Sequence, residues 1–291
     1  MRYIWASITK SMKNYGNDII EHCLKNILNL PEPALFLDAL NEPYPSKLDL
    51  SQYKFIINPG STTLYPDNKL FDSAENHPPI ICFGGSIFNS GNNYYPEMVA
   101  VADKMRKPVG CRDLFTYGIL RKQRIPSEFI GCPTLIPQIS SAKGDYIAFS
   151  FGKNDIAGQI KQLRRIASHN TIVVPIHEVH ENIYAETVGV QSVRGAKSLI
   201  EAYYNARCVI TGRLHGALPA VAAGIPVYFF KDDKSYDSRL TLLEYLSVPI
   251  IGICEIKEVE AGRIEYNRSK VTELQCAFTD YVRRFKEEFV I

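Results

Sequence analysis

The sequence lacks both an apolar run long enough to cross a bilayer and an N-terminal segment of the signal-peptide type. Its longest apolar stretch, residues 217–230, is interrupted by two prolines and a glycine, whereas a transmembrane helix needs about 20 apolar residues. The apolar residues at the start of the chain are few and are interrupted by hydroxyl side chains, unlike the hydrophobic region of a signal peptide. We therefore expect a cytoplasmic protein that contacts a membrane at most peripherally.

Cysteine pairs of metal-binding spacing are also missing. The seven cysteines are scattered and odd in number, and no two form a Cys-x-x-Cys motif, which argues against a disulfide framework and a structural zinc site. His177 and His180 occur as His-Glu-x-His, which does not match the zincin patterns. We therefore expect no metal. This segment either contacts substrate, with His177 as a candidate acceptor-binding residue, or is an ordinary surface loop.

The chain has no strong excess of one charge and no nucleotide-binding fingerprint. It carries 33 Lys and Arg against 31 Asp and Glu, a formal net charge of +2, without a dense basic block or an RNA- or DNA-binding motif. The glycine turns at residues 59–63 and 84–86 match neither Gly-x-Gly-x-x-Gly nor a P-loop. We therefore expect neither a nucleic-acid partner nor a dinucleotide or ATP cofactor.

What the chain does contain is an alternation of short apolar runs with helical patterns. At 291 residues, 46% of them hydrophobic, it exceeds the usual size of one core. The alternation is typical of parallel sheets with crossover helices. It predicts an α/β protein with two Rossmann-like domains facing a cleft, which we place at residues 1–135 and 136–291, with a linker within residues 133–145.

The predicted elements follow from the same patterns. Strands are predicted at residues 2–6, 34–37, 54–58, 80–83, 108–111 and 127–132, and then at 146–150, 171–175, 208–211, 227–230 and 248–253. Helices are predicted at residues 17–28, 114–123, 156–168, 196–206, 217–223, 240–246 and 271–289. The last helix repeats apolar residues at helical spacing, so we expect it to pack back on the body. Its basic residues Arg283, Arg284 and Lys286 leave a peripheral membrane role open.

The most informative stretch is residues 209–217, where a strand gives way to a helix and Arg213 and His215 lie two positions apart. Ligands of open α/β sheets bind at the carboxyl ends of strands, so we expect both side chains to face the cleft. A surface turn can carry the same two residues. However, the apolar neighbours of Arg213 make an unpaired cation costly, and an anionic partner is expected.

Arg112 follows another predicted strand in the same way. If Arg112 and Arg213 point into one cleft, they form a clamp for a ligand with two anionic groups, because guanidinium matches carboxylate and phosphate. The alternative for Arg112 is an ion pair with Asp113 or a nearby carboxylate. The glycines Gly84 and Gly85, and the turn that contains Ser61, allow close backbone approach to a ligand, and Ser61 is a candidate for acceptor binding.

The segment 14–18, Asn-Tyr-Gly-Asn-Asp, precedes the first long helix. Its backbone amides are candidates to hold an anion, but an ordinary helix cap by Asn or Asp explains the same residues. Asn17 and Asp18 are further candidates for acceptor binding.

At these residues the chain resembles the polysaccharide pyruvyl transferase family. The matching pieces are Gly-Arg-Leu-His-Gly at residues 212–216, Gly-Cys-Arg-Asp at 110–113, the segment 14–18, and Cys-Pro-Thr-Leu at 132–135. The resemblance implies a fold similar to the glycosyltransferase-B type and the transfer of pyruvate from phosphoenolpyruvate to two hydroxyls of a sugar, as a cyclic ketal. It places Lys234 at the donor, where we also expect Arg112, Arg213, Gly216, Gly84 and Gly85, and it implies a surface-polysaccharide precursor as acceptor, which we expect to be lipid-linked.

The bottom-up chemistry agrees with this resemblance. Phosphoenolpyruvate carries the two anions that Arg112 and Arg213 can clamp, and His215 is the candidate acid and base, because its ordinary pKa is about 6.5. Flanking cations would lower the pKa of His215, and bound donor would offset them. No step requires a metal or cofactor. The alternatives are a nucleotide-sugar-dependent glycosyltransferase of the same fold and a non-catalytic glycan-binding or assembly protein.

Overall fold

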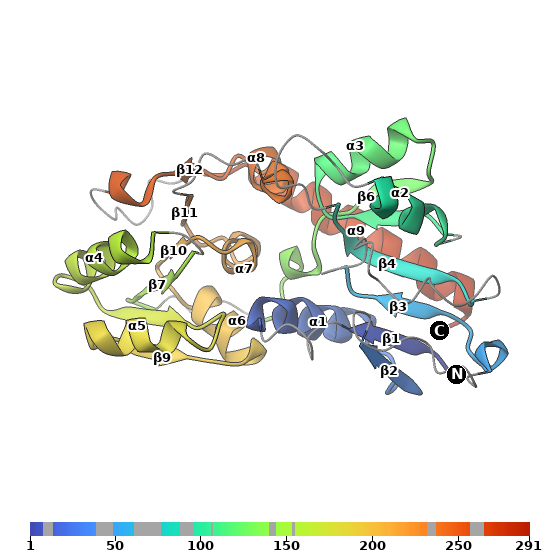
Figure 1. The fold of residues 1–291 in the computed structure, drawn as a ribbon, viewed down its shortest axis with the longest axis horizontal. Coiled ribbons are helices and arrows are strands. Elements are labelled where there is room, and N and C mark those ends of the chain that lie inside the picture. Colours follow the sequence, from blue (N-terminus) through green and yellow to red (C-terminus); the bar gives the residue numbers. More distant parts are fainter. Residues whose placement is uncertain are drawn as a thin grey trace.

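The computed structural model describes residues 1–7, 14–38, 49–60, 77–87, 96–105, 107–139, 144–152, 155–231, 237–256 and 265–291. Within these residues the chain forms two parallel six-stranded sheets (Figure 1). None of the helices described there combines the length and the apolar character needed to cross a membrane.

The first sheet has the strand order β2-β1-β3-β4-β5-β6. Its core strand β1 pairs in parallel with β2 and β3, so that Ile4 lies opposite Leu35 on one side and Ile56 on the other. These strands are short and almost wholly apolar because both faces of a parallel sheet are covered. The strands are β1 Ile4–Ser7, β2 Leu35–Asp38, β3 Ile56–Asn58, β4 Ile80–Gly85, β5 Val109–Cys111 and β6 Ser127–Phe129.

The second sheet repeats this architecture with the order β12-β11-β10-β7-β8-β9. Its strands are β7 Ile147–Ser150, β8 Ile172–Pro175, β9 Gln191–Val193, β10 Cys208–Thr211, β11 Val227–Phe230 and β12 Ile250–Ile251. Two Rossmann-like sheets in sequence confirm the α/β class predicted from the alternating pattern. The boundary between residues 135 and 136, as a division into separate domains, stays a prediction.

The helices cover both sheets, and most lie where helical periodicity predicted them. They are α1 Tyr15–Leu28, α2 Pro96–Asp103, α3 Leu114–Lys122, α4 Ile156–Ala167, α5 Glu181–Val188, α6 Ala196–Tyr204, α7 Leu214–Ala222, α8 Thr241–Tyr245 and α9 Arg268–Phe289. Short 3-10 turns include η3 Pro133–Leu135 and η4 Ser238–Leu240. The short elements α2, α5 and β9 were not predicted. The helix expected at residues 217–223 begins three residues earlier, so His215 lies in its first turn.

Helix α1 packs against both halves of the chain, the first with strands β1 to β6 and the second with strands β7 to β12. Ile19 and Ile20 pack in one hydrophobic cluster with Leu199 of α6 and other residues of the second half. Leu24 packs with Trp5 in the core beneath the first sheet. The halves are therefore held together by a helix that is buried against both of them, and α1 lies between the two sheets in Figure 1.

Helix α9 returns from the second half to cover the first sheet (Figure 1). Phe285 meets the ring of Phe55 edge to face at 5.0 Å between centroids, and Tyr281 meets Phe83 at 5.5 Å. Phe278 lies in the same cluster. The expectation that the terminal helix packs back on the body is therefore confirmed, and the surface it covers belongs to the first sheet.

Replacing Phe278 with Ala tests how much α9 contributes to this core. Phe278 is 1% exposed, and removing a buried phenyl ring costs about 3–5 kcal/mol. We expect urea denaturation to show a loss of that size. Phe36→Ala is the matched control, because Phe36 is 38% exposed, and its loss should be much smaller. Equal stabilities for the two variants would contradict the packing described.

Candidate functional site

Arg112 leaves the carboxyl end of β5 and is buried although it is charged. Its residue is 3% exposed, and its backbone N–H donates to the carbonyl of Gly85 at 2.8 Å. The nearest carboxylate is Oδ2 of Asp113, which lies 3.9 Å from Nε. Nε is buried and has no hydrogen-bond partner among the residues that the structure describes. The Asp113 ion pair considered from the sequence is therefore present, but it is long and leaves a donor unsatisfied.

Asp113 itself is occupied by structural hydrogen bonds. Its Oδ1 caps α3 by accepting the backbone N–H of Thr116 at 2.8 Å, and its Oδ2 accepts the hydroxyl of Ser86 at 2.7 Å. Burial raises the pKa of Asp113, an effect opposed by the charge of Arg112. The carboxylate therefore fixes the helix start beside Arg112 and balances its charge only at a distance.

Arg213 follows β10 and finds its anionic partners within the chain. Nη1 donates to Oε1 of Glu178 at 2.7 Å, and Nη2 donates to Oε1 of Glu181 at 2.5 Å. Nε donates to the carbonyl of Phe151 at 2.7 Å. The anionic partner that we expected for Arg213 from its apolar neighbours is thus a pair of glutamates on the segment after β8. The sequence analysis considered only the histidines of that segment and did not predict a role for its glutamates.

Glu181 is the more firmly held of the two carboxylates. Its residue is 1% exposed, and its Oε2 also accepts the backbone N–H groups of His177 at 2.7 Å and of Glu178 at 3.2 Å. Burial raises the pKa of Glu181, and the Arg213 charge opposes that shift. Arg213 and Glu181 together fix the turn that carries His177.

His177 is buried and connects the two halves. Its carbonyl accepts the backbone N–H of Tyr15, the first residue of α1, at 2.9 Å. Its Nε2 lies 2.5 Å from the hydroxyl of Tyr203, which lies 2.7 Å from Oγ of Ser150. Burial and then the Arg213 charge lower the pKa of His177 to about 3. The imidazole is therefore neutral at neutral pH.

His215 lies in the first turn of α7 and is the second neutral imidazole of the site. Burial lowers its pKa well below the usual value, and the charges of Arg112 and Arg239 add to the shift. Its Nε2 is buried without a hydrogen-bond partner in the described part of the chain. The lowered pKa agrees in direction with the sequence-based expectation, although burial contributes most and Arg239 was not anticipated.

Gly16 brings the start of α1 against both imidazoles. A Cβ at this position would lie 3.0 Å from Oδ1 of Asn14, 3.2 Å from Nδ1 of His177 and 3.4 Å from Nδ1 of His215. The side chain of Asn14 caps α1 by accepting the Gly16 N–H at 2.9 Å. The backbone N–H of Gly16 is used by this cap, and that of Tyr15 is used by the carbonyl of His177. An ordinary helix cap therefore accounts for the Asn and Gly residues of the segment 14–18, in which an anion site was the other interpretation.

Of the three glycines assigned to the donor, Gly216 and Gly84 lie at close packing contacts. A Cβ on Gly216 would lie 2.7 Å from Oγ1 of Thr211 and 2.9 Å from the hydroxyl of Tyr203. Gly84 has a positive φ of 92° and would meet a carbonyl oxygen at 3.0 Å, while Gly85 accepts the Arg112 N–H. Gly216 and Gly84 therefore have a packing role and Gly85 accepts a backbone hydrogen bond, and donor binding by the three glycines stays a prediction.

The remaining predicted residues divide between described and undescribed parts of the chain. Asn17 is buried and Asp18 half-buried in the first turn of α1, where burial raises the pKa of Asp18. Lys234 and Ser61 lie outside the described residues.

Asp237 and Arg239 form a part of the site that sequence reasoning missed. Nε and Nη2 of Arg239 donate to the two oxygens of Asp237 at 2.8 and 2.6 Å. Burial alone would raise the pKa of Asp237, but the hydrogen bonds and charge of Arg239 lower it overall. Asp-x-Arg is too common a pattern to be recognised in the sequence, and only the fold places it near His215.

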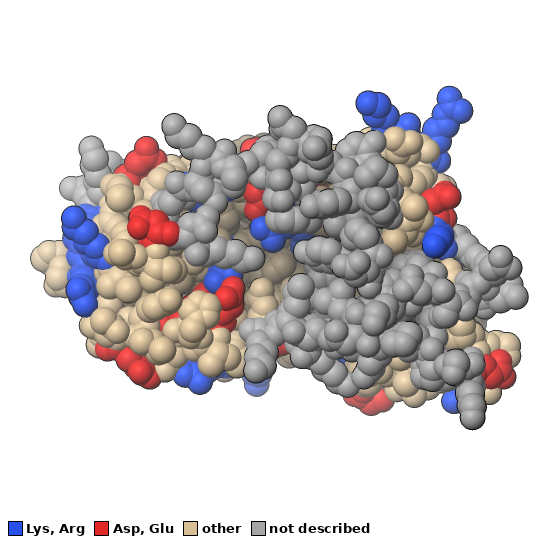
Figure 2. All heavy atoms as spheres, viewed as in Figure 1, with Lys and Arg blue, Asp and Glu red and all other residues tan. Residues whose placement is uncertain are grey.

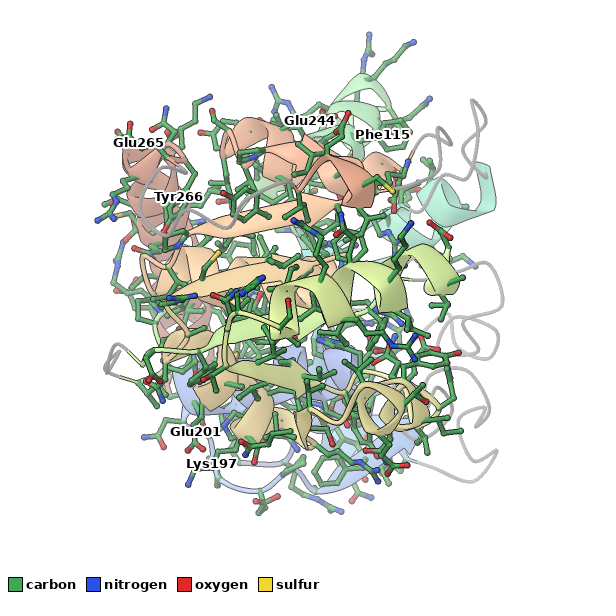
Figure 3. All side chains as sticks on the ribbon, turned by 90° about the vertical axis from the view of Figure 1, so that its left-hand side faces the viewer. Phe115, Lys197, Glu201, Glu244, Glu265 and Tyr266 are labelled. Atoms are coloured by element: carbon green, nitrogen blue, oxygen red, sulfur yellow. The ribbon has the colours of Figure 1, made fainter. Side chains whose placement is uncertain are left out.

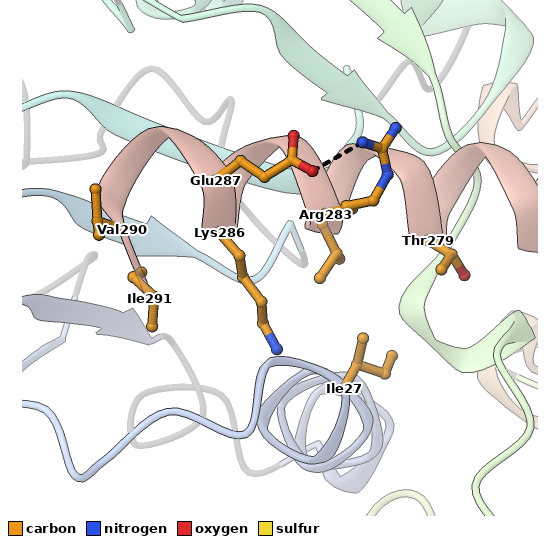
Figure 4. Close-up of a pocket in the computed structure, with 8 residues that line it drawn as sticks. Ile27, Thr279, Arg283, Lys286, Glu287, Val290 and Ile291 are labelled. Atoms are coloured by element: carbon orange, nitrogen blue, oxygen red, sulfur yellow. Dashed lines mark hydrogen bonds and ion pairs between the residues drawn. The ribbon is translucent and has the colours of Figure 1, made fainter.

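The molecular surface is hollowed between the two halves, with basic and acidic side chains at the margin (Figure 2). A separate groove of about 710 Å³ lies between α9 and the C-terminal part of α1 (Figure 4). It is lined by Ile27 and by residues of the last turns of α9, including Lys286 and Val290. None of the candidate site residues lines that groove. Within the described residues, no three His, Cys, Asp or Glu side chains gather as metal ligands.

The arrangement of two parallel sheets has counterparts among solved structures. A putative UDP-N-acetylglucosamine 2-epimerase from Listeria monocytogenes matches with a TM-score of 0.52 at 9% identity, over 97% of this chain and 89% of that chain. The wall teichoic acid polymerase TagF matches with a TM-score of 0.50 at 10% identity, over 98% and 82% of the two chains. These similarities define a glycosyltransferase-B-like fold.

The family model of polysaccharide pyruvyl transferases matches residues 14–234. The chain therefore belongs to the polysaccharide pyruvyl transferase family. The matched segment begins at the cap of α1 and contains Arg112, Arg213 and His215, whereas Arg239 lies beyond it. No curated protein matches the chain with significance.

The lowered pKa of His177 predicts a pH-dependent stability. The unfolded chain takes up a proton on His177 below about pH 6.5 and the folded chain does not, so the contribution of His177 to stability falls by about 1.4 kcal/mol per pH unit as the pH drops from 6.5 toward 3. Urea denaturation at several pH values should show a shallower dependence for His177→Gln than for the wild type. The exposed His169 gives the control His169→Gln, and parallel curves for all three proteins would contradict the expectation.

Arg213→Gln tests the glutamate pair. The substitution leaves the buried carboxylate of Glu181 without its cation, and breaking a buried ion pair costs about 3–5 kcal/mol. We expect a marked fall in melting temperature. The double variant Arg213→Gln with Glu181→Gln should recover part of the loss, because both charges are then removed. No recovery in the double variant would show that the pair is not coupled.

Proposed function

We propose that this protein transfers the pyruvyl group of phosphoenolpyruvate to two hydroxyls of a sugar in a surface-polysaccharide precursor and forms a cyclic ketal. The supporting observation is that Arg112 and His215, from opposite halves, each keep a buried nitrogen without a hydrogen-bond partner among the described residues. Buried polar groups are rarely left unpaired, and each exception calls for an explanation such as a catalytic role or a bound ion or water. A donor anion beside Arg112 would satisfy the first of these groups and bring its enol carbon toward the second.

The reaction balances with the groups of this site. A proton moves to the methylene carbon of the donor, and a sugar hydroxyl attacks the neighbouring carbon, giving up its own proton. The bond from that carbon to the phosphate oxygen then breaks, and a second hydroxyl closes the ring. Of the two hydroxyl protons, one replaces the proton spent on the methyl group and one leaves with phosphate.

His215 is the group that we place at these proton transfers. Its lowered pKa keeps the imidazole neutral at neutral pH, so it can accept the hydroxyl proton as a base. A bound dianion raises the pKa again, because a nearby negative charge favours the imidazolium. The same ring can then donate a proton to carbon. The step requires no metal or cofactor.

The acceptor would lie at the start of α1, where Asn17 and Asp18 are close to the segment that carries His177. Hydrogen bonds from such side chains are the usual means of orienting sugar hydroxyls. A lipid-linked acceptor would bring the protein to the inner face of a membrane without inserting it.

His215→Ala tests the proposal. Incubation of the wild type with phosphoenolpyruvate and candidate glycosides should release phosphate and add a pyruvyl mass to one glycoside. The variant should lose transfer by at least 100-fold, in the usual range for a general acid or base, while it retains donor binding. His169→Ala, at an exposed position after α4, should behave as the wild type. Normal transfer by His215→Ala would refute its role.

A UDP titration separates the alternative functions. The fold is similar to those of a putative UDP-N-acetylglucosamine 2-epimerase and a wall teichoic acid polymerase. A nucleotide-sugar-dependent glycosyltransferase is therefore the alternative function to test. Competition by phosphoenolpyruvate and weak UDP binding would support pyruvyl transfer. Tight UDP binding with turnover of a nucleotide sugar would favour the glycosyltransferase, and binding of glycans without any turnover would favour a non-catalytic protein.

A further inference from the structure

Glu178 and Glu181 both bind Arg213, but they differ in what else can reach them. Glu181 is buried, and both of its oxygens accept hydrogen bonds within the chain, Oε1 from Arg213 and Oε2 from two backbone N–H groups. The side chain of Glu178 is 28% exposed, and its Oε1 accepts from Nη1 of Arg213 at 2.7 Å. Glu178 is therefore the carboxylate of the pair that a ligand can contact.

The second oxygen of Glu178 keeps its capacity to accept hydrogen bonds. Oε2 lies 3.7 Å from Nδ1 of the exposed His180, which is too long for a hydrogen bond. Among the residues that the structure describes, none donates a hydrogen bond to this oxygen. A carboxylate only accepts hydrogen bonds, and each oxygen has two lone pairs for them.

The main chain of Glu178 lies beside the start of α1. Glu178 forms an isolated antiparallel bridge with Asn14, the residue that caps this helix. Two residues after Asn14, a Cβ on Gly16 would lie 3.4 Å from Nδ1 of His215. The backbone of Glu178 is thus joined to the segment of α1 that contacts His215.

The side chain of Glu178 is joined to the same place by a second route. Its partner Arg213 lies between β10 and α7, two residues before His215. The guanidinium of Arg213 is held at three nitrogens, because Nε also donates to the carbonyl of Phe151 and Nη2 donates to Glu181. A guanidinium fixed in this way orients the carboxylate that it binds. Glu178 is therefore aligned before any ligand arrives.

His215 is the observation that points to a ligand at this junction. Its Nε2 is buried and has no hydrogen-bond partner among the described residues. A general base must lie within hydrogen-bond reach of the proton that it removes, so one hydroxyl of the acceptor has to come to this imidazole. The rest of the sugar would then extend along the start of α1.

We infer that Glu178 binds the sugar acceptor and accepts a hydrogen bond from one of the two hydroxyls that the pyruvyl group bridges. This inference rests on the proposed function and names a residue that holds its acceptor. A cyclic ketal requires two hydroxyls held side by side, and His215 receives the proton of one of them at a time. Glu178 would hold the other in place, and Arg213 is then a positioning residue for Glu178.

The charge of Glu178 favours the acceptor over the donor as its ligand. A carboxylate repels the phosphate and the carboxylate of phosphoenolpyruvate, whereas it accepts hydrogen bonds from a neutral diol at no such cost. Glu178 follows β8 and Arg213 follows β10, so both lie at the carboxyl edge of the second sheet, where α/β proteins bind ligands. The donor would lie toward Arg112, which comes from the first sheet.

Glu178→Gln tests this assignment. Glutamine keeps the size of the side chain and an oxygen that can accept from Arg213, but it replaces the second oxygen by an amide that only donates. The probes are the methyl glycosides of glucose, galactose and mannose, which carry free hydroxyls at C4 and C6. For the glycoside that the wild type uses, the KM should rise about tenfold, as expected for the loss of one hydrogen bond to a charged group.

Two further measurements separate binding of the acceptor from damage to the site. The KM for phosphoenolpyruvate should stay within twofold of the wild type. The melting temperature should change little, because ion pairs of partly exposed carboxylates add little stability. Unchanged KM for the glycoside in Glu178→Gln would overturn the inference, and so would an equal rise in the KM values for glycoside and donor.

Glu201→Gln is the matched control. Glu201 lies on α6 of the same half, its side chain is 46% exposed, and it pairs only loosely with Lys197 at 3.9 Å. Figure 3 shows both residues together at the lower edge of the second half. The substitution removes the same charge, and both KM values should stay within twofold of the wild type.

The proposed function and this inference fail in different ways. If the wild type releases no phosphate from phosphoenolpyruvate with any of these glycosides, the proposed function is wrong and the inference falls with it. If the wild type transfers pyruvate and Glu178→Gln does so with the same KM for the glycoside, only the assignment of Glu178 is wrong.

Discussion

The buried contact of Arg213 with Glu178 and Glu181 is the interaction on which the site depends. It joins the β10–α7 turn to the residue after β7 and to the segment after β8. That segment in turn binds the start of α1 through the carbonyl of His177. A buried ion pair adds little stability compared with apolar packing, but it is costly to break. Its main effect here is to define one position for each of the loops that it connects.

The two imidazoles acquire their properties from this arrangement. Both rings are neutral because burial and neighbouring arginines disfavour the imidazolium. His177 is bound to Tyr203, whereas Nε2 of His215 has no such partner in the described residues. Two residues of one type, both close to Gly16, therefore differ in their contacts: the ring of His177 is fixed by a hydrogen bond, whereas a ring nitrogen of His215 is unpaired within the described residues.

Much of the fold could be predicted from the sequence because parallel strands are short apolar runs and their crossover helices are periodic. The position of Arg112, Arg213 and His215 after strands follows from that pattern alone. The glutamate partners of Arg213, however, depend on how the segment after β8 folds back, and Arg239 depends on the docking of η4 against Ile87. Neither is encoded by local spacing.

The roles of the glycines also could not be predicted from the local sequence alone. A glycine beside a strand end suits a ligand and a close packing contact equally well, and only the fold shows that Gly216 lies against Tyr203. Similarly, the apolar face of α9 predicted a packed helix, but the periodicity of a single helix does not say which sheet it covers.

The return of α9 to the first sheet links the order of synthesis to folding. Trp5, Phe55 and Phe83 lie in one cluster with Phe278 and Phe285, so the first sheet stays open on one face until residues 268–289 have been made. Contacts of such long sequence separation slow folding, and they prevent the simple succession in which an N-terminal unit folds before the next one emerges. The nascent first half would thus expose an aromatic surface for most of translation, and we expect it to depend on the second half, or on a chaperone, for protection until then.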